Sequence, residues 1–319
     1  MIWLKFAVNA AFIVVFCISL SKYADQLAAA KKVGKGFVGF VLLGVVTSIP
    51  ELISTVSCTV YLDNPVMGTA NIMGSNNANM FILFLALLAV RTLRRPSGNI
   101  DVESCVSLGY CMIITSIFLL GIFFSGAPFY GKSVFVYLIF LVFVLSVISL
   151  YKSNPDEEED SGEKESLGWF FYCKFVFFAV GLIASSFCLS IVVDELGRET
   201  NIGSAAAGAI FLAWATSLPE LVVTITSIIC GSVEMGIGNI LGSNIFNFFV
   251  LAFAESVSRS SVSVFSREDG MMILGVFNAV LQGILLILLM QKNLKCIGRV
   301  PVMPVVSMLI YILGMTLLV

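Results

Sequence analysis

Residues 47–51 read Thr-Ser-Ile-Pro-Glu, and residues 216–220 read Thr-Ser-Leu-Pro-Glu, 169 positions later. A second motif recurs in the same order, because residues 74–79 read Gly-Ser-Asn-Asn-Ala-Asn and residues 242–247 read Gly-Ser-Asn-Ile-Phe-Asn, 168 positions later. Two matched motifs at nearly the same offset indicate an internal duplication with a period of about half the chain. We therefore expect the fold to consist of two copies of one structural unit.

The composition identifies lipid as the solvent of this fold. The chain has 319 residues, of which 59% are hydrophobic and 12% charged, and its mean hydropathy is +1.02. A helix crosses the hydrocarbon core of a bilayer with roughly 20 apolar residues. Ten apolar segments meet this requirement, at residues 3–30, 37–62, 66–90, 102–124, 131–151, 167–194, 204–230, 233–257, 270–290 and 300–319.

Ten spans place five in each half, and an odd number makes the second half enter the membrane from the opposite side. We therefore predict an all-α membrane protein with ten transmembrane helices arranged as two inverted five-helix repeats. The first repeat covers residues 1–151, with its motifs at 44–79, and the second covers residues 167–319, with its motifs at 213–247. Residues 152–166 form an acidic linker between the repeats.

The positive charges predict the orientation. With all ten spans retained, thirteen of the 18 Lys and Arg fall on the side of the acidic linker and five fall on the other side. Cytoplasmic loops of membrane proteins carry an excess of Lys and Arg. We expect a multi-pass protein of the cell (plasma) membrane, with both termini extracellular and the acidic linker in the cytoplasm.

The first motif places oxygen-bearing residues on one helix face in each repeat. The positions i, i+3, i+4 and i+7 are Gly44, Thr47, Ser48 and Glu51 in the second span, and Ala213, Thr216, Ser217 and Glu220 in the seventh. Pro50 and Pro219 each lack a backbone N–H, so the carbonyls of Val46 and Ala215 lose their helical donor and a bend is expected.

The second motif places amides and a hydroxyl at positions i, i+4 and i+8. These are Asn71, Ser75 and Asn79 in the third span, and Asn239, Ser243 and Asn247 in the eighth. Such groups often only hydrogen-bond neighbouring helices, as we expect of Asn278 and Gln282 in the ninth span. A carboxylate in the middle of a membrane is different, because it costs at least ~2.5 kcal/mol and persists where it meets a cation or a polar cavity.

The available ligand atoms indicate a hard cation. The chain has no His, and its eight Cys are scattered singly. An all-oxygen site suits Ca²⁺ and Na⁺, and two carboxylates balance one Ca²⁺ or two Na⁺. No basic residue is placed to activate a nucleophile, so no enzyme is predicted. A net charge of −2 gives no field that would attract nucleic acid. A cation channel remains the alternative from another class.

At these residues the chain resembles the sodium/calcium exchanger family, in the cation/calcium exchanger superfamily, in its prokaryotic form. The resemblance implies antiport of Na⁺ against Ca²⁺ by alternating access, with the second, third, seventh and eighth helices as a core and the first and sixth helices sliding across it. It implies that Glu51 and Glu220 bind Ca²⁺ together with main-chain oxygens at Thr47 and Thr216. It implies Na⁺ sites at Gly44, Ser48, Ser75, Ala213, Ser217 and Ser243, with Asn79 and Asn247 at the centre.

Three features distinguish this chain from parts of that family. Val46 and Ala215 stand where a glycine usually precedes Thr-Ser. The asparagine at position 247 is an aspartate in several potassium-dependent relatives, and proton-coupled relatives commonly show Gly-Asn-Ala before the glutamate. The neutral Asn247 disfavours K⁺ co-transport, and Thr-Ser before each glutamate motif disfavours proton coupling. Because glutamates can titrate, proton-coupled or K⁺-dependent exchange is kept as the alternative to Na⁺/Ca²⁺ exchange. No cofactor and no obligate protein partner are predicted.

Overall fold

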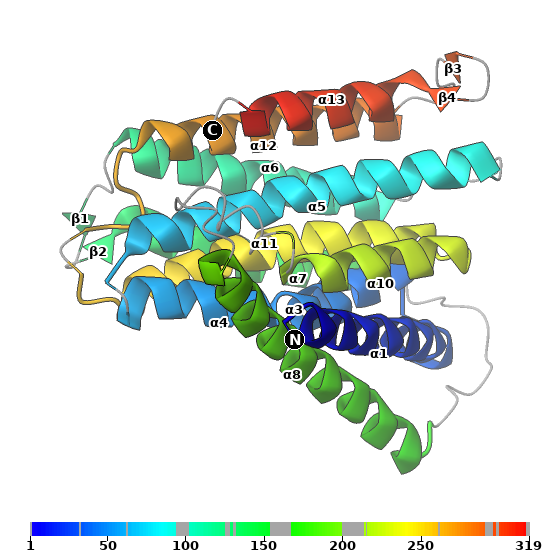
Figure 1. The fold of residues 1–319 in the computed structure, drawn as a ribbon. Coiled ribbons are helices and arrows are strands. Elements are labelled where there is room, and N and C mark those ends of the chain that lie inside the picture. Colours follow the sequence, from blue (N-terminus) through cyan, green and yellow to red (C-terminus); the bar gives the residue numbers. More distant parts are fainter. Residues whose placement is uncertain are drawn as a thin grey trace.

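The chain is almost entirely helical (Figure 1). The computed structural model describes residues 2–31, 33–61, 63–93, 102–124, 128–129, 132–153, 167–199, 214, 216–260, 262–290, 296–297 and 300–316. The helices are α1 (Ile2–Lys31), α2 (Lys35–Phe37), the π-helical η1 (Val38–Leu43), α3 (Gly44–Thr47), α4 (Ile49–Val56), the π-helical η2 (Ser57–Tyr61), α5 (Pro65–Leu93), α6 (Val102–Phe123), α7 (Val134–Ser153), α8 (Trp169–Glu199), α10 (Leu218–Ile229), α11 (Val233–Val257), α12 (Asp269–Met290) and α13 (Val302–Thr316). Two short antiparallel strand pairs lie between helices: β1 (Pro128–Phe129) with β2 (Lys132–Ser133), and β3 (Cys296–Ile297) with β4 (Val300–Pro301).

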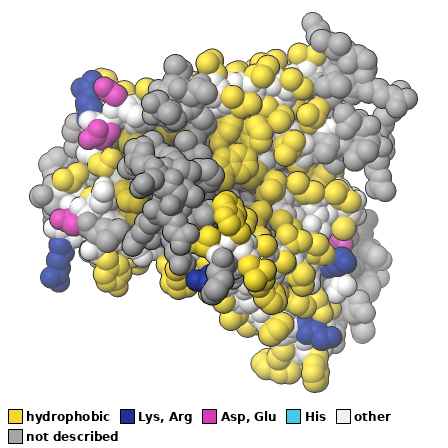
Figure 2. Space-filling view, viewed as in Figure 1, with side chains coloured by type: hydrophobic (Ala, Val, Ile, Leu, Met, Phe, Trp, Pro, Cys, Tyr) yellow, Lys and Arg dark blue, Asp and Glu magenta, His cyan; other side chains and the backbone are white. Residues whose placement is uncertain are grey.

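Helix length and composition identify a membrane protein. Seven described helices (α1, α5, α6, α7, α8, α11 and α12) are long and apolar enough to cross a bilayer, and a bent pair, Lys35–Thr47 with Ile49–Tyr61, makes an eighth span. Two more apolar helices, Leu218–Ile229 and Val302–Leu313, are shorter. Hydrophobic side chains cover most of the described surface in Figure 2. The prediction of an all-α membrane protein is confirmed, while the described helices by themselves give seven or eight spans.

The second predicted span is broken where the sequence places its proline. The helix axis bends by 41° between the two halves. The break falls at Ser48, whose φ of −91° and ψ of 8° are not helical, and Pro50 then lies in the first turn of α4. Proline is well accommodated there, since the first turn of a helix has no partner for its N–H groups. Ser217, with φ of −82° and ψ of 3°, precedes α10 and Pro219 in the same way.

The centre of the molecule is formed by α5 and α11. In their most apolar 18-residue windows, 78% and 89% of the residues are buried, compared with 17% in α1 and 22% in α8. Glycines let the backbone of α11 lie directly on η1 and α3. A Cβ atom added at Gly242 would collide with the carbonyl oxygen of Phe40, and one added at Gly44 would lie 2.8 Å from the backbone nitrogen of Ser243. Such close approach is typical of small residues at helix interfaces in membranes.

Two separate hydrophobic clusters surround this centre. The larger one joins α5, α6, α7, α11, α12 and α13, and the smaller one joins α1 and α8 to η1 and α10. Phe16 of α1 packs edge-on against Phe177 of α8, and Gly181 of α8 leaves room for the Phe16 ring. In Figure 1, α1 and α8 lie on the opposite side of α11 from α12 and α13. The pair α1 and α8 therefore packs against the centre through η1 and α10, apart from the larger cluster.

Candidate ion-binding site

The two predicted glutamates lie side by side in the interior. Glu51 and Glu220 are each fully buried, in the first turn of α4 and of α10. Each carboxylate thus lies three residues after a serine with non-helical backbone angles, Ser48 or Ser217. At the first break, the carbonyl of Val46 has no helical donor because Pro50 has no N–H. Glu51 also lies within electrostatic reach of Glu220, so the pair concentrates negative charge in an apolar environment.

One cluster of hydroxyls joins the two repeats at Glu220. Ser48 donates a hydrogen bond to Glu220 Oε1 over 3.0 Å, and Ser243 donates to the same oxygen over 3.4 Å. The Ser243 hydroxyl also lies 3.2 Å from the carbonyl oxygen of Gly44 and 3.2 Å from Thr47 Oγ1. Two predicted residues, Ser48 and Ser243, therefore contact one oxygen of Glu220, and Ser243 links Gly44 and Thr47 to it.

Other oxygens at the site are buried without a hydrogen-bond partner among the described residues. They are both carboxylate oxygens of Glu51, Oε2 of Glu220, the hydroxyls of Ser75 and Ser217, and the amide oxygens of Asn79 and Asn247. Ser75 and Thr216 lie close to the Glu51 carboxylate. More than nine in ten buried polar groups in proteins have a partner. Seven unpaired oxygen atoms therefore lie on predicted site residues, and oxygen is the ligand atom that hard cations prefer.

Asparagine side chains pair across the centre in a reciprocal pattern. The amide of Asn79 donates to Asn244 Oδ1 over 3.0 Å, and the amide of Asn247 donates to Asn76 Oδ1 over 2.9 Å. Asn76 and Asn244 each also donate to the other's backbone carbonyl over 3.4 Å. Each bond has its counterpart with the roles of the two repeats exchanged. Asn76 and Asn244 were not among the predicted site residues, although their place in the duplicated motif could have identified them.

A second matched pair lies behind the site. Asn71 donates to Thr55 Oγ1 over 3.2 Å, and Asn239 donates to Thr224 Oγ1 over 3.0 Å. These amides hold α5 against α4 and α11 against α10. Their amide nitrogens therefore stabilise the packing of the helices that carry the site.

Of the twelve predicted site residues, one lies outside the described part of the structure. Ala213 lies outside the described residues, and the other eleven predicted residues lie in the described part of the chain. No group of three His, Cys, Asp or Glu side chains that could hold a metal occurs in that part. A cation at this site would therefore be bound by two carboxylates and otherwise by neutral oxygens.

The fold and the buried glutamates together define a helical membrane protein with paired carboxylates in its interior. The chain belongs to the sodium/calcium exchanger protein family, whose sequence model matches residues 1–149 and 170–319. The resemblance recognised from the duplicated motifs is thereby confirmed.

Curated relatives cover most of the chain at low identity. The inner membrane protein YrbG of Escherichia coli is 24% identical over 249 residues, which are 74% of this chain and 74% of that protein. The sodium/calcium exchanger MaX1 of Methanosarcina acetivorans is 25% identical over 286 residues, covering 74% of this chain and 78% of that one.

Solved structures share the fold. A structure of the sodium-calcium exchanger NCX_Mj soaked with Na⁺ and Sr²⁺ covers 99% of this chain and 99% of its own, with a TM-score of 0.77 at 17% identity. A structure of the same exchanger soaked with Na⁺ and Ca²⁺ has a TM-score of 0.75 at 18% identity. At this identity the likeness establishes the arrangement of helices.

Proposed function

We propose that this protein is a secondary antiporter that exchanges Na⁺ for Ca²⁺ across a cell membrane by alternating access. The observation that carries the proposal is the pair of buried glutamates, each in the first turn of its helix, with four further unpaired oxygens on other predicted site residues. Membership of the sodium/calcium exchanger family supports it. Ca²⁺ and Na⁺ are substrates in this proposal, and the lipid bilayer is the surrounding medium.

The ligands are assigned residue by residue. Glu51 and Glu220 bind Ca²⁺ together with main-chain oxygens at Thr47 and Thr216. The Na⁺ sites use Gly44, Ser48, Ser75, Ala213, Ser217 and Ser243, with Asn79 and Asn247 at the centre. Support comes from the unpaired oxygens of Ser75, Ser217, Asn79 and Asn247 and from the contacts of Ser48 and Ser243 with Glu220.

Exchange follows from shared ligands. Two carboxylates balance one Ca²⁺ or two Na⁺. A site surrounded by apolar side chains therefore cannot hold Ca²⁺ and two Na⁺ together without excess positive charge. Occupancy by one ion therefore excludes the other. A site whose charge is neutralised can then be covered by a sliding helix at lower cost than a bare pair of carboxylates.

The topology belongs to the same proposal. Ten spans form two inverted repeats, residues 1–151 and 167–319, joined by the cytoplasmic linker 152–166, with both termini extracellular. The shorter helices α10 and α13 belong to the seventh and tenth spans. The reciprocal asparagine bonds between α5 and α11 support an internal two-fold relation. The separate packing of α1 with α8 supports their role as the moving pair.

The test is uptake of radioactive Ca²⁺ into proteoliposomes that contain the purified protein. Vesicles loaded with Na⁺ are compared with vesicles loaded with K⁺ and with vesicles that have only an outward proton gradient. We expect uptake that requires internal Na⁺. Uptake driven by protons, or only in the presence of K⁺ together with Na⁺, would replace this proposal with the corresponding alternative, and uptake down a Ca²⁺ gradient with no counter-ion would indicate a channel.

A further inference from the structure

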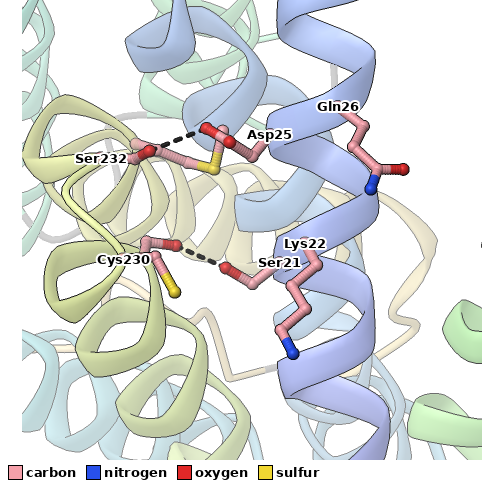
Figure 3. A pocket seen from close by; sticks show the side chains of 8 residues that line it. Ser21, Lys22, Asp25, Gln26, Cys230 and Ser232 are labelled. Carbon is pink, nitrogen blue, oxygen red and sulfur yellow. Dashed lines mark hydrogen bonds between the residues drawn. The ribbon is translucent and has the colours of Figure 1, made fainter.

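A pocket of about 200 Å³ opens where α1 meets the turn between α10 and α11 (Figure 3). Ser21 and Asp25 line it from α1, and Ser227, Cys230 and Ser232 line it from the other side. A single water needs about 10–15 Å³ of such volume. The pocket therefore has room for a hydrated cation, and most of these groups offer oxygen.

A charged contact involves two of the residues that line this pocket, Asp25 and Ser232. Lys35 forms an ion pair with Asp25 over 2.6 Å and donates to the Ser232 hydroxyl over 3.0 Å. Ser232 in turn donates to Asp25 over 2.7 Å. These three residues join α1 to the start of α2 and to the turn that precedes α11. The Asp25–Lys35–Ser232 contact thus ties the helix that packs with α8 to the central helices.

One face of α1 leads from this contact to the ion-binding site. Cys17, Ser21 and Asp25 recur every four residues and so lie on the same helix face. Ser21 hydrogen-bonds Ser227 of α10 over 2.8 Å, and the Cys17 thiol contacts the carbonyl of Pro219, beside Glu220, at 3.7 Å.

The other wall of this route is α10. Ser227 lies two turns, about 10 Å, from Glu220 along the helix. Both Ser21 and Ser227 are almost fully buried, so the route between pocket and site is closed in this structure. A buried oxygen of Glu220, Oε2, has no partner among the described residues and lies at the far end.

We propose that this pocket is the entrance through which Ca²⁺ and Na⁺ reach Glu220 from one face of the membrane, and that the Asp25–Lys35–Ser232 contact closes it. This inference rests on the proposed exchange function. When α1 moves away from α10, the contact breaks, the Asp25 carboxylate is released to attract cations, and the Ser21 and Ser227 hydroxyls separate to line the route.

The closing contact has opposite effects on the two faces. A ligand's apparent dissociation constant is its intrinsic constant divided by the fraction of protein in the competent state. Weakening the contact raises the fraction that is open at the pocket and lowers the fraction that is open at the opposite face. Apparent affinity for Ca²⁺ must then rise on one side and fall on the other.

The experiment compares Na⁺-driven Ca²⁺ uptake in right-side-out and inside-out membrane vesicles, with Ca²⁺ titrated at each face. Lys35→Met removes the pairing cation, and we expect the Ca²⁺ KM to fall about threefold at the pocket face and to rise at the other face, as suits a half-exposed ion pair. Ser232→Ala, which changes no charge, is expected to shift both values in the same directions by less. The double change Asp25→Lys with Lys35→Asp restores the pair and is expected to return both values toward those of the wild type.

Lys31→Met is the matched control, because it removes one positive charge at the nearby end of α1 from a residue that is not part of the Asp25–Lys35–Ser232 contact. Its two KM values are expected to stay at the wild-type values. Equal shifts at both faces, a change in maximal rate alone, or the same response in Lys31→Met would overturn the inference. If the wild type itself shows no Na⁺-driven uptake, the proposed function fails; if it does and Lys35→Met and Ser232→Ala leave both KM values unchanged, only the entrance assignment fails.

Discussion

Gly44→Ala tests whether the direct contact of two backbones sets the geometry of the ion site. An added Cβ would lie 2.8 Å from the backbone nitrogen of Ser243 and 3.0 Å from the carbonyl carbon of Gly242. Ordinary contacts begin near 3.4 Å, so α3 and α11 must separate by about 0.6 Å in a close-packed interior. A functional site tolerates errors of only ~0.5 Å, and the Ser243 hydroxyl contacts both Glu220 and Thr47.

We expect the Ca²⁺ KM of Gly44→Ala to rise about tenfold, equivalent to ~1.4 kcal/mol of binding free energy. Overpacking should also cost about 1–3 kcal/mol of stability. The assay is Na⁺-driven Ca²⁺ uptake, with thermal unfolding measured on the same preparation. Gly109→Ala is the control, because its added Cβ meets nothing within 4 Å. A Gly44→Ala protein with wild-type KM would refute the reasoning, since it would show that α11 can shift without disturbing the oxygens.

Three further predictions concern buried polar groups. Glu51→Gln and Glu220→Gln should each abolish exchange in the uptake assay. The melting temperature in ion-free buffer should stay unchanged or rise, because each variant removes an uncompensated buried charge. Wild-type activity in both variants would contradict the site assignment. Asn79→Ala and Asn247→Ala each remove one bond of the reciprocal pair, so their losses in unfolding free energy should agree within ~0.5 kcal/mol, at about 1 kcal/mol each; a loss in only one variant would contradict the two-fold relation. Gln282→Leu removes donors to Asn278 and Thr115 and should cost about 1–3 kcal/mol of stability with an unchanged Ca²⁺ KM, whereas a changed KM would extend the site to α12.

The elements that hydropathy predicts are the long ones. Apolar runs predicted α1, α5, α6, α7, α8, α11 and α12, because each has enough uninterrupted apolar residues to cross a bilayer. The proline in the first motif predicted a bend in the second span. It did not predict that the break would lie at Ser48, two residues earlier, because proline fits the first turn of the helix that follows.

The site was predicted as far as duplication could reveal it. Paired motifs identified Glu51 and Glu220, which the structure buries in the first turns of α4 and α10, within electrostatic reach of each other. Periodicity could not choose among the asparagines of one helix, so the bonding of Asn76 with Asn247 and of Asn79 with Asn244 appeared only in three dimensions. The pocket was equally hidden, since Asp25 and Ser232 are 207 residues apart in sequence.

The glycine contacts between the two halves bear on how this protein is made. At Gly39 and Gly44 the backbone of the bent second helix lies directly against α11, at Met235 and at Gly242–Ser243. The Ser243 hydroxyl that reaches Gly44 belongs to chain that is synthesised 199 residues later. The N-terminal half is therefore synthesised before α11 can cover these glycines. Until then, lipid or an insertion factor must cover them. If the N-terminal half were expressed alone, its exposed glycines could pack against any helix with small residues on one face. This interface therefore creates a risk of misassembly between nascent copies.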